Sequence, residues 1–149
     1  MPHLYTWDEY LKAFLLHVGI IEATPICLPN QISSPCICFF IEPNGEIDLI
    51  GSFDWFTGKD YINVGAFFPQ NSLPNMNLTT MSKSIGDILF EKGVFGHVTV
   101  DLISFPDPTG NSTHPLFYAV DINCYMTDYA ASVYTFDLLM EGRMDKLTG

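Results

Sequence analysis

Two apolar runs joined by a turn constrain this sequence most. Residues 36–42 (Cys-Ile-Cys-Phe-Phe-Ile-Glu) and residues 47–53 (Ile-Asp-Leu-Ile-Gly-Ser-Phe) each have the length of a strand. Between them, segment 43–46 reads Pro-Asn-Gly-Glu, in which proline presets the first turn position and a later glycine tolerates a positive φ angle. The pattern therefore predicts a β-hairpin.

Helices are predicted where apolar residues recur at helical spacing between a capping residue and a glycine. Thr6 and Glu9 form a capping box before the first such stretch, and Gly19 follows it. Thr127 or Asp128 is expected to cap the last one. The predicted elements are, in order, a helix at 7–18, a loop-rich stretch at 20–35, the hairpin, a possible strand at 61–67, a helix at 80–92, strands at 97–105 and 116–123, and a helix at about 128–141.

This order of elements predicts an α+β fold with a mostly antiparallel sheet and helices packed on one face. A chain of 149 residues is about one domain long. We therefore expect a single domain over 1–149. Its first part, 1–35, is expected to form a helix and a loop-rich lead-in, and 36–142 the sheet and the other helices.

The charge balance argues against several classes of partner. The chain has 17 acidic and 6 basic residues, and its net charge is −11. Nucleic acids and anionic membrane surfaces attract clustered lysines and arginines, so neither is expected as a partner. Phosphate groups are repelled by carboxylates, so a bound polyphosphate would need metal ions or lysines from another lobe.

The sequence favours a cytoplasmic protein with reduced, buried thiols. The four cysteines show no spacing typical of a zinc site, and Cys36 and Cys38 lie two apart in an apolar run, so they share one face of a strand. The first residues lack the basic and apolar regions of a secretory signal. No apolar stretch reaches the ~18 residues that a membrane span needs.

The last two predicted strands bring three oxygen-bearing side chains together. The polar connection 106–115 has its midpoint between Gly110 and Asn111. Pairing about that midpoint places Asp101 opposite Asp121, give or take one residue, and Asn123 shares the face of Asp121. Facing carboxylates repel unless a cation lies between them, and Mg²⁺ prefers oxygen ligands of this kind. The pattern is compatible with a magnesium site at Asp101, Asp121 and Asn123.

A second interpretation of the same residues remains open. Asp101 can be a solvent-facing strand residue, and Asp121 can help to cap the last helix. Neither residue would then bind a metal.

The runs Gly-Val-Phe-Gly-His-Val-Thr-Val-Asp-Leu-Ile-Ser-Phe (93–105) and Phe-Tyr-Ala-Val-Asp-Ile-Asn (117–123) resemble the C-terminal lobe of ATP-grasp proteins. In that family a helix ending in glycine leads to a strand carrying an acid, and a returning strand carries acid-x-Asn. The resemblance covers about 36–141. It implies that Asp101, Asp121 and Asn123 hold Mg²⁺ against the terminal phosphates of ATP, and that the nucleotide is shared with a missing N-terminal lobe or another protein.

The sequence departs from the ATP-grasp pattern in three respects. Family members commonly have Glu at the second ligand, where this chain has the shorter Asp121. They commonly follow the asparagine with an arginine or a Pro-Gly turn, whereas here Cys-Tyr-Met-Thr-Asp follows at 124–128. The lobe that carries the adenine and phosphate contacts is absent from this sequence.

These departures leave three hypotheses for the function. The first is a Mg-nucleotide-binding lobe without full ligase activity alone. In a complete enzyme of this type, ATP activates a carboxylate as an acyl phosphate that an amine or thiol attacks. The second is a pseudoenzyme, a non-catalytic interaction or scaffold module that retains the fold. The third is a truncated product with exposed apolar surface that dimerises or aggregates.

Other polar residues are weaker candidates, and no catalytic acid, base or nucleophile can be named. His97 could contact a phosphate, although a structural histidine at a strand start is the simpler interpretation. Asp128 is better explained as a helix cap than as a ligand. The lysines that could reach phosphate, but more simply lie on the solvated surface, are Lys59, Lys83 and Lys92.

Overall fold

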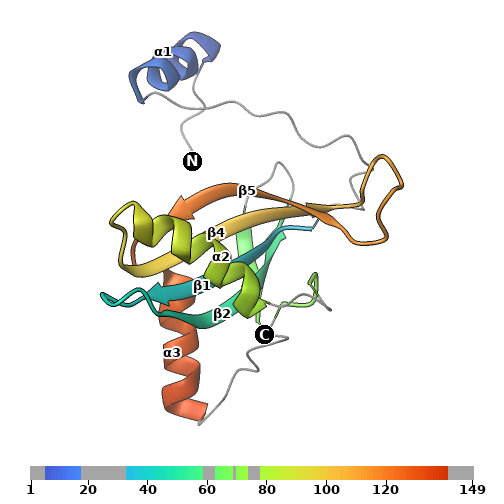
Figure 1. The fold of residues 1–149 in the computed structure, drawn as a ribbon. Coiled ribbons are helices and arrows are strands. Elements are labelled where there is room, and N and C mark those ends of the chain that lie inside the picture. The colour runs from blue at the N-terminus through green and yellow to red at the C-terminus, as the bar shows by residue number, and fades with distance from the viewer. Residues whose placement is uncertain (1–5, 18–32, 59–62, 69, 74–77, 141–149) are drawn as a thin grey trace.

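The computed structural model describes residues 6–17, 33–58, 63–68, 70–73 and 78–140. Five strands form one antiparallel sheet in the order β3-β2-β1-β4-β5 (Figure 1). The α+β class and the antiparallel sheet are therefore confirmed. The elements are α1 (Trp7–His17), β1 (Pro35–Ile41), β2 (Ile47–Thr57), β3 (Asn63–Phe67), α2 (Leu78–Glu91), β4 (Gly96–Phe105), β5 (Leu116–Asn123) and α3 (Asp128–Met140).

The predicted hairpin is present as β1 and β2, which pair from Ile41 opposite Ile47 outward. Gly45 in the turn has a φ angle of 87°, which a glycine adopts without steric cost. The amide of Glu42 donates to the carbonyl of Glu46 at 2.8 Å and closes the turn. The turn chemistry thus sets the register as far as Phe39 opposite Leu49, beyond which the register shifts by one residue.

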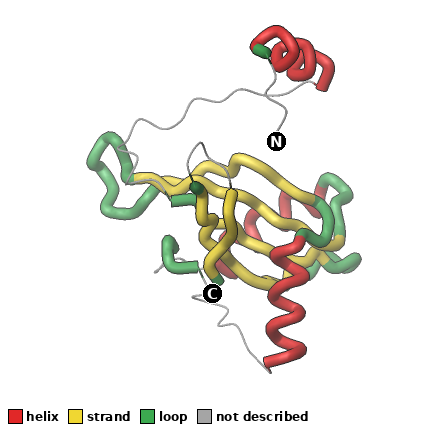
Figure 2. Tube along the Cα trace, turned by 180° about the vertical axis from the view of Figure 1, so that it is seen from behind, coloured by secondary structure: helices red, strands yellow, loops and turns green. Residues whose placement is uncertain are grey.

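Helices α2 and α3 cover opposite faces of the sheet, which corrects the expectation that the helices pack on one face. Ile37, Phe39 and Ile41 of β1 form a core with the α2 side, whereas Cys36 and Cys38 form a second core with α3. Figure 1 shows α2 in front of the sheet, and Figure 2, seen from behind, shows α3 in front. Because alternate strand residues point to opposite faces, an apolar residue at nearly every position of β1 requires a cover on both sides.

Helix α2 approaches the sheet closely because it carries a glycine at the contact. Gly86 is buried, and a Cβ atom built there would lie 2.5 Å from Cδ1 and 2.9 Å from Cγ1 of Ile47. Both distances are shorter than van der Waals contact. A larger side chain at this position requires either the Ile47 side chain or the helix to shift.

We predict that Gly86→Val destabilises the fold by ~1–3 kcal/mol, the usual cost of overfilling a packed core. Its Cβ and methyl groups would collide with Ile47, and the small gain in helix propensity does not offset this. Urea unfolding measures the change. The matched control is Ser84→Val on the exposed side of α2, which should stay within about 0.5 kcal/mol of the parent. Equal stability of the two variants would contradict the close approach.

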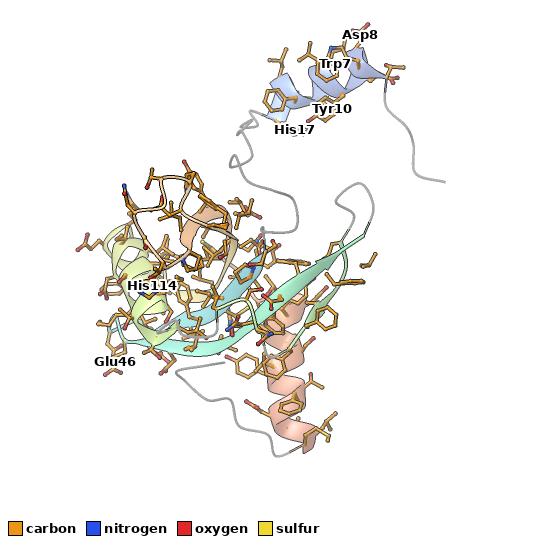
Figure 3. All side chains as sticks on the ribbon, turned by 90° about the vertical axis from the view of Figure 1, so that its right-hand side faces the viewer. Trp7, Asp8, Tyr10, His17, Glu46 and His114 are labelled. Atoms are coloured by element: carbon orange, nitrogen blue, oxygen red, sulfur yellow. The ribbon has the colours of Figure 1, made fainter. Side chains whose placement is uncertain are left out.

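Helix α1 has the predicted capping box but no buried residue. The amide of Thr6 donates to Oε2 of Glu9 at 2.8 Å, and the amide of Glu9 donates back to Oγ1 of Thr6 at 3.4 Å. Trp7 and Tyr10 are exposed and lie apart from the sheet (Figure 3). The predicted end of this helix at 18 and most of the loop-rich stretch 20–35 lie outside the described residues.

Strand β2 extends four residues past its predicted end at 53, to Thr57, whereas the later boundaries agree with the predictions to within about two residues. The possible strand at 61–67 is present as Asn63–Phe67, and the helix predicted at 80–92 runs from Leu78 to Glu91. None of the described helices has the length and apolar character needed to cross a membrane.

Candidate metal site

The register of β4 against β5 contains one extra residue that decides which side chains meet. Phe105 pairs with Leu116, and this register continues to Leu102 opposite Ala119. Between Leu102 and Asp101 the register shifts by one residue, so Val120 is a bulge and Asp101 pairs with Asp121. The predicted pairing of Asp101 with Asp121 is confirmed.

Without this bulge the two carboxylates would not share a face. In the unbroken register Val120 would lie opposite Asp101, and Asp121 would pair with Val100 and point toward α2, because a slip of one residue reverses every side chain. After the bulge, Asn123 pairs with Thr99 on the same face as Asp121. All three predicted ligands therefore project toward α3.

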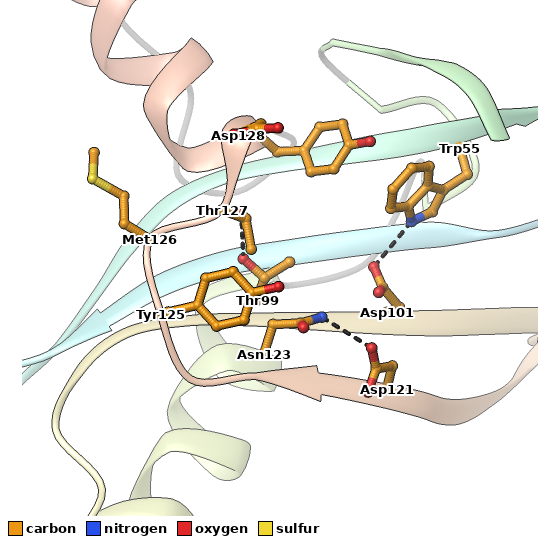
Figure 4. A pocket seen from close by; sticks show the side chains of 10 residues that line it. Trp55, Thr99, Asp101, Asp121, Asn123, Tyr125, Met126, Thr127 and Asp128 are labelled. Atoms are coloured by element: carbon orange, nitrogen blue, oxygen red, sulfur yellow. Dashed lines mark hydrogen bonds between the residues drawn. The ribbon is translucent and has the colours of Figure 1, made fainter. Parts of the chain in front are cut away.

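A cavity of about 340 Å³ lies on this face (Figure 4). Its floor is formed by β4 and β5, and its wall by Trp55 of β2, the segment 125–127 and the first residues of α3. None of the residues that line it is basic. They are Trp55, Thr99, Asp101, Asp121, Asn123, Tyr125, Met126, Thr127, Asp128 and Tyr129.

Each of the three predicted ligands makes a hydrogen bond within the site. Oδ1 of Asp101 accepts from Nε1 of Trp55 at 2.9 Å. Oδ2 of Asp121 accepts from Nδ2 of Asn123 at 3.1 Å, and its Oδ1 accepts from the amide of Ile122 at 2.9 Å. The amide nitrogen of Asn123 thus faces Asp121, and its oxygen would face a cation after a half-turn of the amide group.

The carboxylate of Asp101 is electrostatically strained. Burial raises its pKa above the ordinary value of 3.8, the hydrogen bond from Trp55 opposes this rise, and the charge of Asp121 adds to it. Asp121 itself is exposed. A half-buried carboxylate beside a second one is favourable for a cation, which would remove both the desolvation cost and the repulsion.

The donor set of the site consists of two carboxylates and one amide. No group of three His, Cys, Asp or Glu side chains suited to a metal occurs within the described part of the chain. Oxygen atoms of carboxylates and amides are nevertheless the ligands of hard divalent cations such as Mg²⁺, which usually bind one or two carboxylates and keep several waters. The residues present therefore fit Mg²⁺ better than Zn²⁺, which favours sulfur and imidazole.

A line of buried hydroxyl groups fixes the start of α3 above the site. Oγ1 of Thr99 lies 2.9 Å from Oγ1 of Thr127 and 3.3 Å from Sγ of Cys38. Thr127 also accepts from the amide of Ala130 at 3.4 Å and so caps α3. Of the two predicted caps, Thr127 has this role, and Asp128 is the first helical residue and lines the cavity.

Sequence reasoning missed Trp55 and undervalued Asp128. Trp55 continues the face of Phe53 along β2, so strand periodicity alone could have placed it on the α3 side. Its contact with Asp101 spans 46 residues and crosses β1, which no local pattern reveals. Asp128 lies next to a cap, where an acidic residue has a sufficient structural explanation.

The other candidates lie away from the cavity. His97 packs edge-on against Phe40, at 4.8 Å between ring centroids, and against Tyr134, at 5.8 Å, which supports a structural role. Lys83 pairs with Asp87 at 3.3 Å on exposed α2, across the sheet from the site. Lys92 is exposed after α2, and Lys59 lies outside the described residues.

The cysteine prediction needs one correction. Cys36 and Cys38 are buried free thiols, as expected, but Cys124 is an exposed one. It follows directly after β5, where the chain leaves the sheet, so the apolar strand does not enclose it. Cys27 lies outside the described residues.

Comparison with known proteins identifies the family. Residues 2–147 match the family described as IQCH-like, ATP-grasp. The chain belongs to the IQCH-like ATP-grasp family. It is 27% identical over 143 residues to IQ motif-containing protein H of Danio rerio, a match that covers 94% of this chain. The chain spans about 13% of the length of that relative.

The family assignment confirms the ATP-grasp resemblance drawn from the two strand sequences. It covers nearly the whole chain, including α1, which the resemblance at 36–141 did not include. In this ATP-grasp chain the acid and acid-x-Asn positions are the residues that the bulged register gathers on one face.

We predict that Asp101 titrates above 3.8 in the metal-free protein and that Asp121→Asn lowers its pKa. A raised pKa means that the folded chain holds this proton more tightly than the unfolded chain does. Its contribution to stability is therefore fully present below pH 3.8 and is lost as the pH rises through the raised pKa.

Carbon-13 NMR of the side-chain carboxyl groups measures this titration. The matched control is Asp137→Asn, which removes an exposed charge of α3 that does not line the cavity. It should leave the pKa of Asp101 unchanged. An identical titration of Asp101 in the parent and in Asp121→Asn would rule out the coupling.

Proposed function

We propose that this chain is the magnesium-binding lobe of an ATP-grasp-like nucleotide site. Asp101, Asp121 and Asn123 would hold Mg²⁺, which would bridge to the terminal phosphates of ATP. The observation that carries the proposal is the bulged register of β4 and β5. It places two carboxylates and an amide on the floor of a cavity that no basic residue lines.

The charge of the chain supports a metal-mediated mode of binding. At a net charge of −11, this lobe repels a free nucleotide, and the lysines that the structure describes are outside the cavity. When bound, Mg²⁺ would neutralise charge between carboxylates and phosphates. Asp101 and Asp121 supply the negative charge of the site, and neutral Asn123 contributes an oxygen without adding repulsion.

The rest of the ATP contacts must come from elsewhere. This chain matches about 13% of its relative in length, and no residue in the cavity is assigned as a catalytic acid or base. We therefore propose that the residues that contact adenine, and the lysines that bind the phosphates, belong to a second lobe or another protein. The chain alone would bind the metal without completing a ligase reaction.

We predict that the chain binds Mn²⁺ or Mg²⁺ in the absence of nucleotide and that Asp101→Asn and Asp121→Asn each weaken binding at least about ten-fold. Loss of a direct ligand costs no less than loss of an outer-shell partner, for which ten-fold is typical. Electron paramagnetic resonance of free Mn²⁺ measures the affinity. Mg-ATP is titrated by calorimetry, with the chain alone and joined to the proposed second lobe.

Asp137→Asn is again the matched control, because it makes the same change of charge outside the cavity. It should bind Mn²⁺ as the parent does. A parent chain that fails to bind Mn²⁺, or three variants that weaken binding equally, would contradict a specific site. A folded Asp121→Asn variant that binds Mg-ATP normally in the joined protein would contradict the metal role of Asp121.

A second candidate function, a non-catalytic interaction module, is favoured by the apolar side chains that β5 exposes. Among the described residues this edge strand pairs only with β4, and its two faces together expose four large apolar side chains, Leu116, Tyr118, Val120 and Ile122. Exposed apolar edges are typical of surfaces that another chain covers. The metal titration separates the two candidates, because a module of this kind requires no cation and its folding would not respond to one.

A further inference from the structure

Trp55 reaches the site across the whole width of strand β1. It belongs to β2, whereas Asp101 belongs to β4, and β1 lies between these two strands. The indole Nε1 nevertheless donates to Oδ1 of Asp101 at 2.9 Å (Figure 4). Cys36, the β1 residue that pairs with both Phe53 and Asp101, belongs to the core cluster against which Trp55 packs.

The indole ring is fixed by two other elements. It packs edge-on against Tyr129 at the start of α3, with 4.6 Å between ring centroids. The hydroxyl of Tyr129 in turn accepts from Nδ2 of Asn63 on β3 at 3.0 Å. The start of α3, through Tyr129, and strand β3, through Asn63, therefore determine where the indole N–H of Trp55 points.

The hydrogen bond leaves one oxygen of Asp101 for another partner. Oδ1 is occupied by the indole, and among the described residues no donor contacts Oδ2. Carboxylates that bind metals are usually oriented by such a donor on the oxygen that does not bind. An indole suits this role because it donates one hydrogen bond, carries no charge and cannot itself bind the cation.

We propose that Trp55 is a positioning residue of the metal site, which holds Asp101 so that its second oxygen faces the cation. This inference rests on the proposed function, because it assigns Trp55 a role at the same site. Trp55 would not contact the metal, and its effect on binding would act through Asp101 alone.

The sequence offers a matched pair of variants for the test. The chain has two tryptophans, Trp55 and Trp7, and Trp7 is 70% exposed on α1. Trp55→Phe keeps an aromatic ring beside Tyr129 and removes the N–H group, and Trp7→Phe makes the same change far from the site. We expect Trp55→Phe to weaken Mn²⁺ binding about ten-fold or more and Trp7→Phe to leave it unchanged.

A spectroscopic readout distinguishes positioning from a general effect on folding. The indole region of a nitrogen-15 NMR spectrum of this chain contains two signals. We expect Mn²⁺ to broaden the signal of Trp55 selectively. We expect Asp101→Ala, which removes the acceptor of the indole hydrogen bond, to shift this signal toward the position of a solvated indole. Replacement of residue 55 by benzothienylalanine, which keeps the bicyclic shape without the N–H, gives the same test if Trp55→Phe does not fold.

The possible outcomes separate this inference from the proposed function. If the parent chain binds no Mn²⁺, both proposals fail. If Asp101→Asn abolishes binding while Trp55→Phe and the benzothienyl variant bind as the parent does, the metal site stands and the role of Trp55 is overturned. Equal broadening of both indole signals also overturns it, since it would place the ion no closer to Trp55 than to Trp7.

Discussion

The one-residue bulge at Val120 is the constraint on which the site depends. A regular β4–β5 pair would direct Asp101 and Asp121 to opposite faces of the sheet, and the bulge returns them to the same face. Bulges are common where a strand must re-aim a side chain, and they persist despite the hydrogen bonds that they disrupt. Here the disruption occurs directly beside the paired carboxylates, which ties the irregularity of the sheet to the chemistry that we propose.

The second constraint is that both faces of β1 are apolar. One face is buried by α2 and the other by α3. After β5 ends, the chain must therefore turn back so that α3 packs on the face of Cys36 and Cys38. The Thr99–Thr127 contact at 2.9 Å fixes the point of return. The packing that buries Cys36 and Cys38 thereby also forms the cavity wall, to which Asp128 and Tyr129 contribute.

Much of this arrangement could be predicted from local patterns, and the rest depends on contacts between distant segments. The hairpin and the capping box follow from turn chemistry and helix signals in the sequence. The Asp101–Asp121 pair is predicted only to within one residue, because the bulge at Val120 that sets it has no local signal. The prediction that the helices share one face is wrong. It does not take into account that β1 has apolar residues on both of its faces, each of which needs a helix to cover it. The contact of Trp55 with Asp101 could not be found, since the two residues lie on strands that are separated by β1. The ligand roles of Asp101, Asp121 and Asn123 stay a prediction, whereas the family is established over residues 2–147.

The position of β5 at the margin of the sheet has a consequence for cooperativity. Two of the three proposed ligands sit on β5, which has a neighbour on one side only among the described strands, so backbone hydrogen bonding restrains it less than a central strand. An ion bound by ligands from both β4 and β5 would cross-link these two strands. Ion binding and the ordering of β5 would then be coupled. Any chain that pairs with the free edge of β5 would raise the affinity for the ion without contacting it.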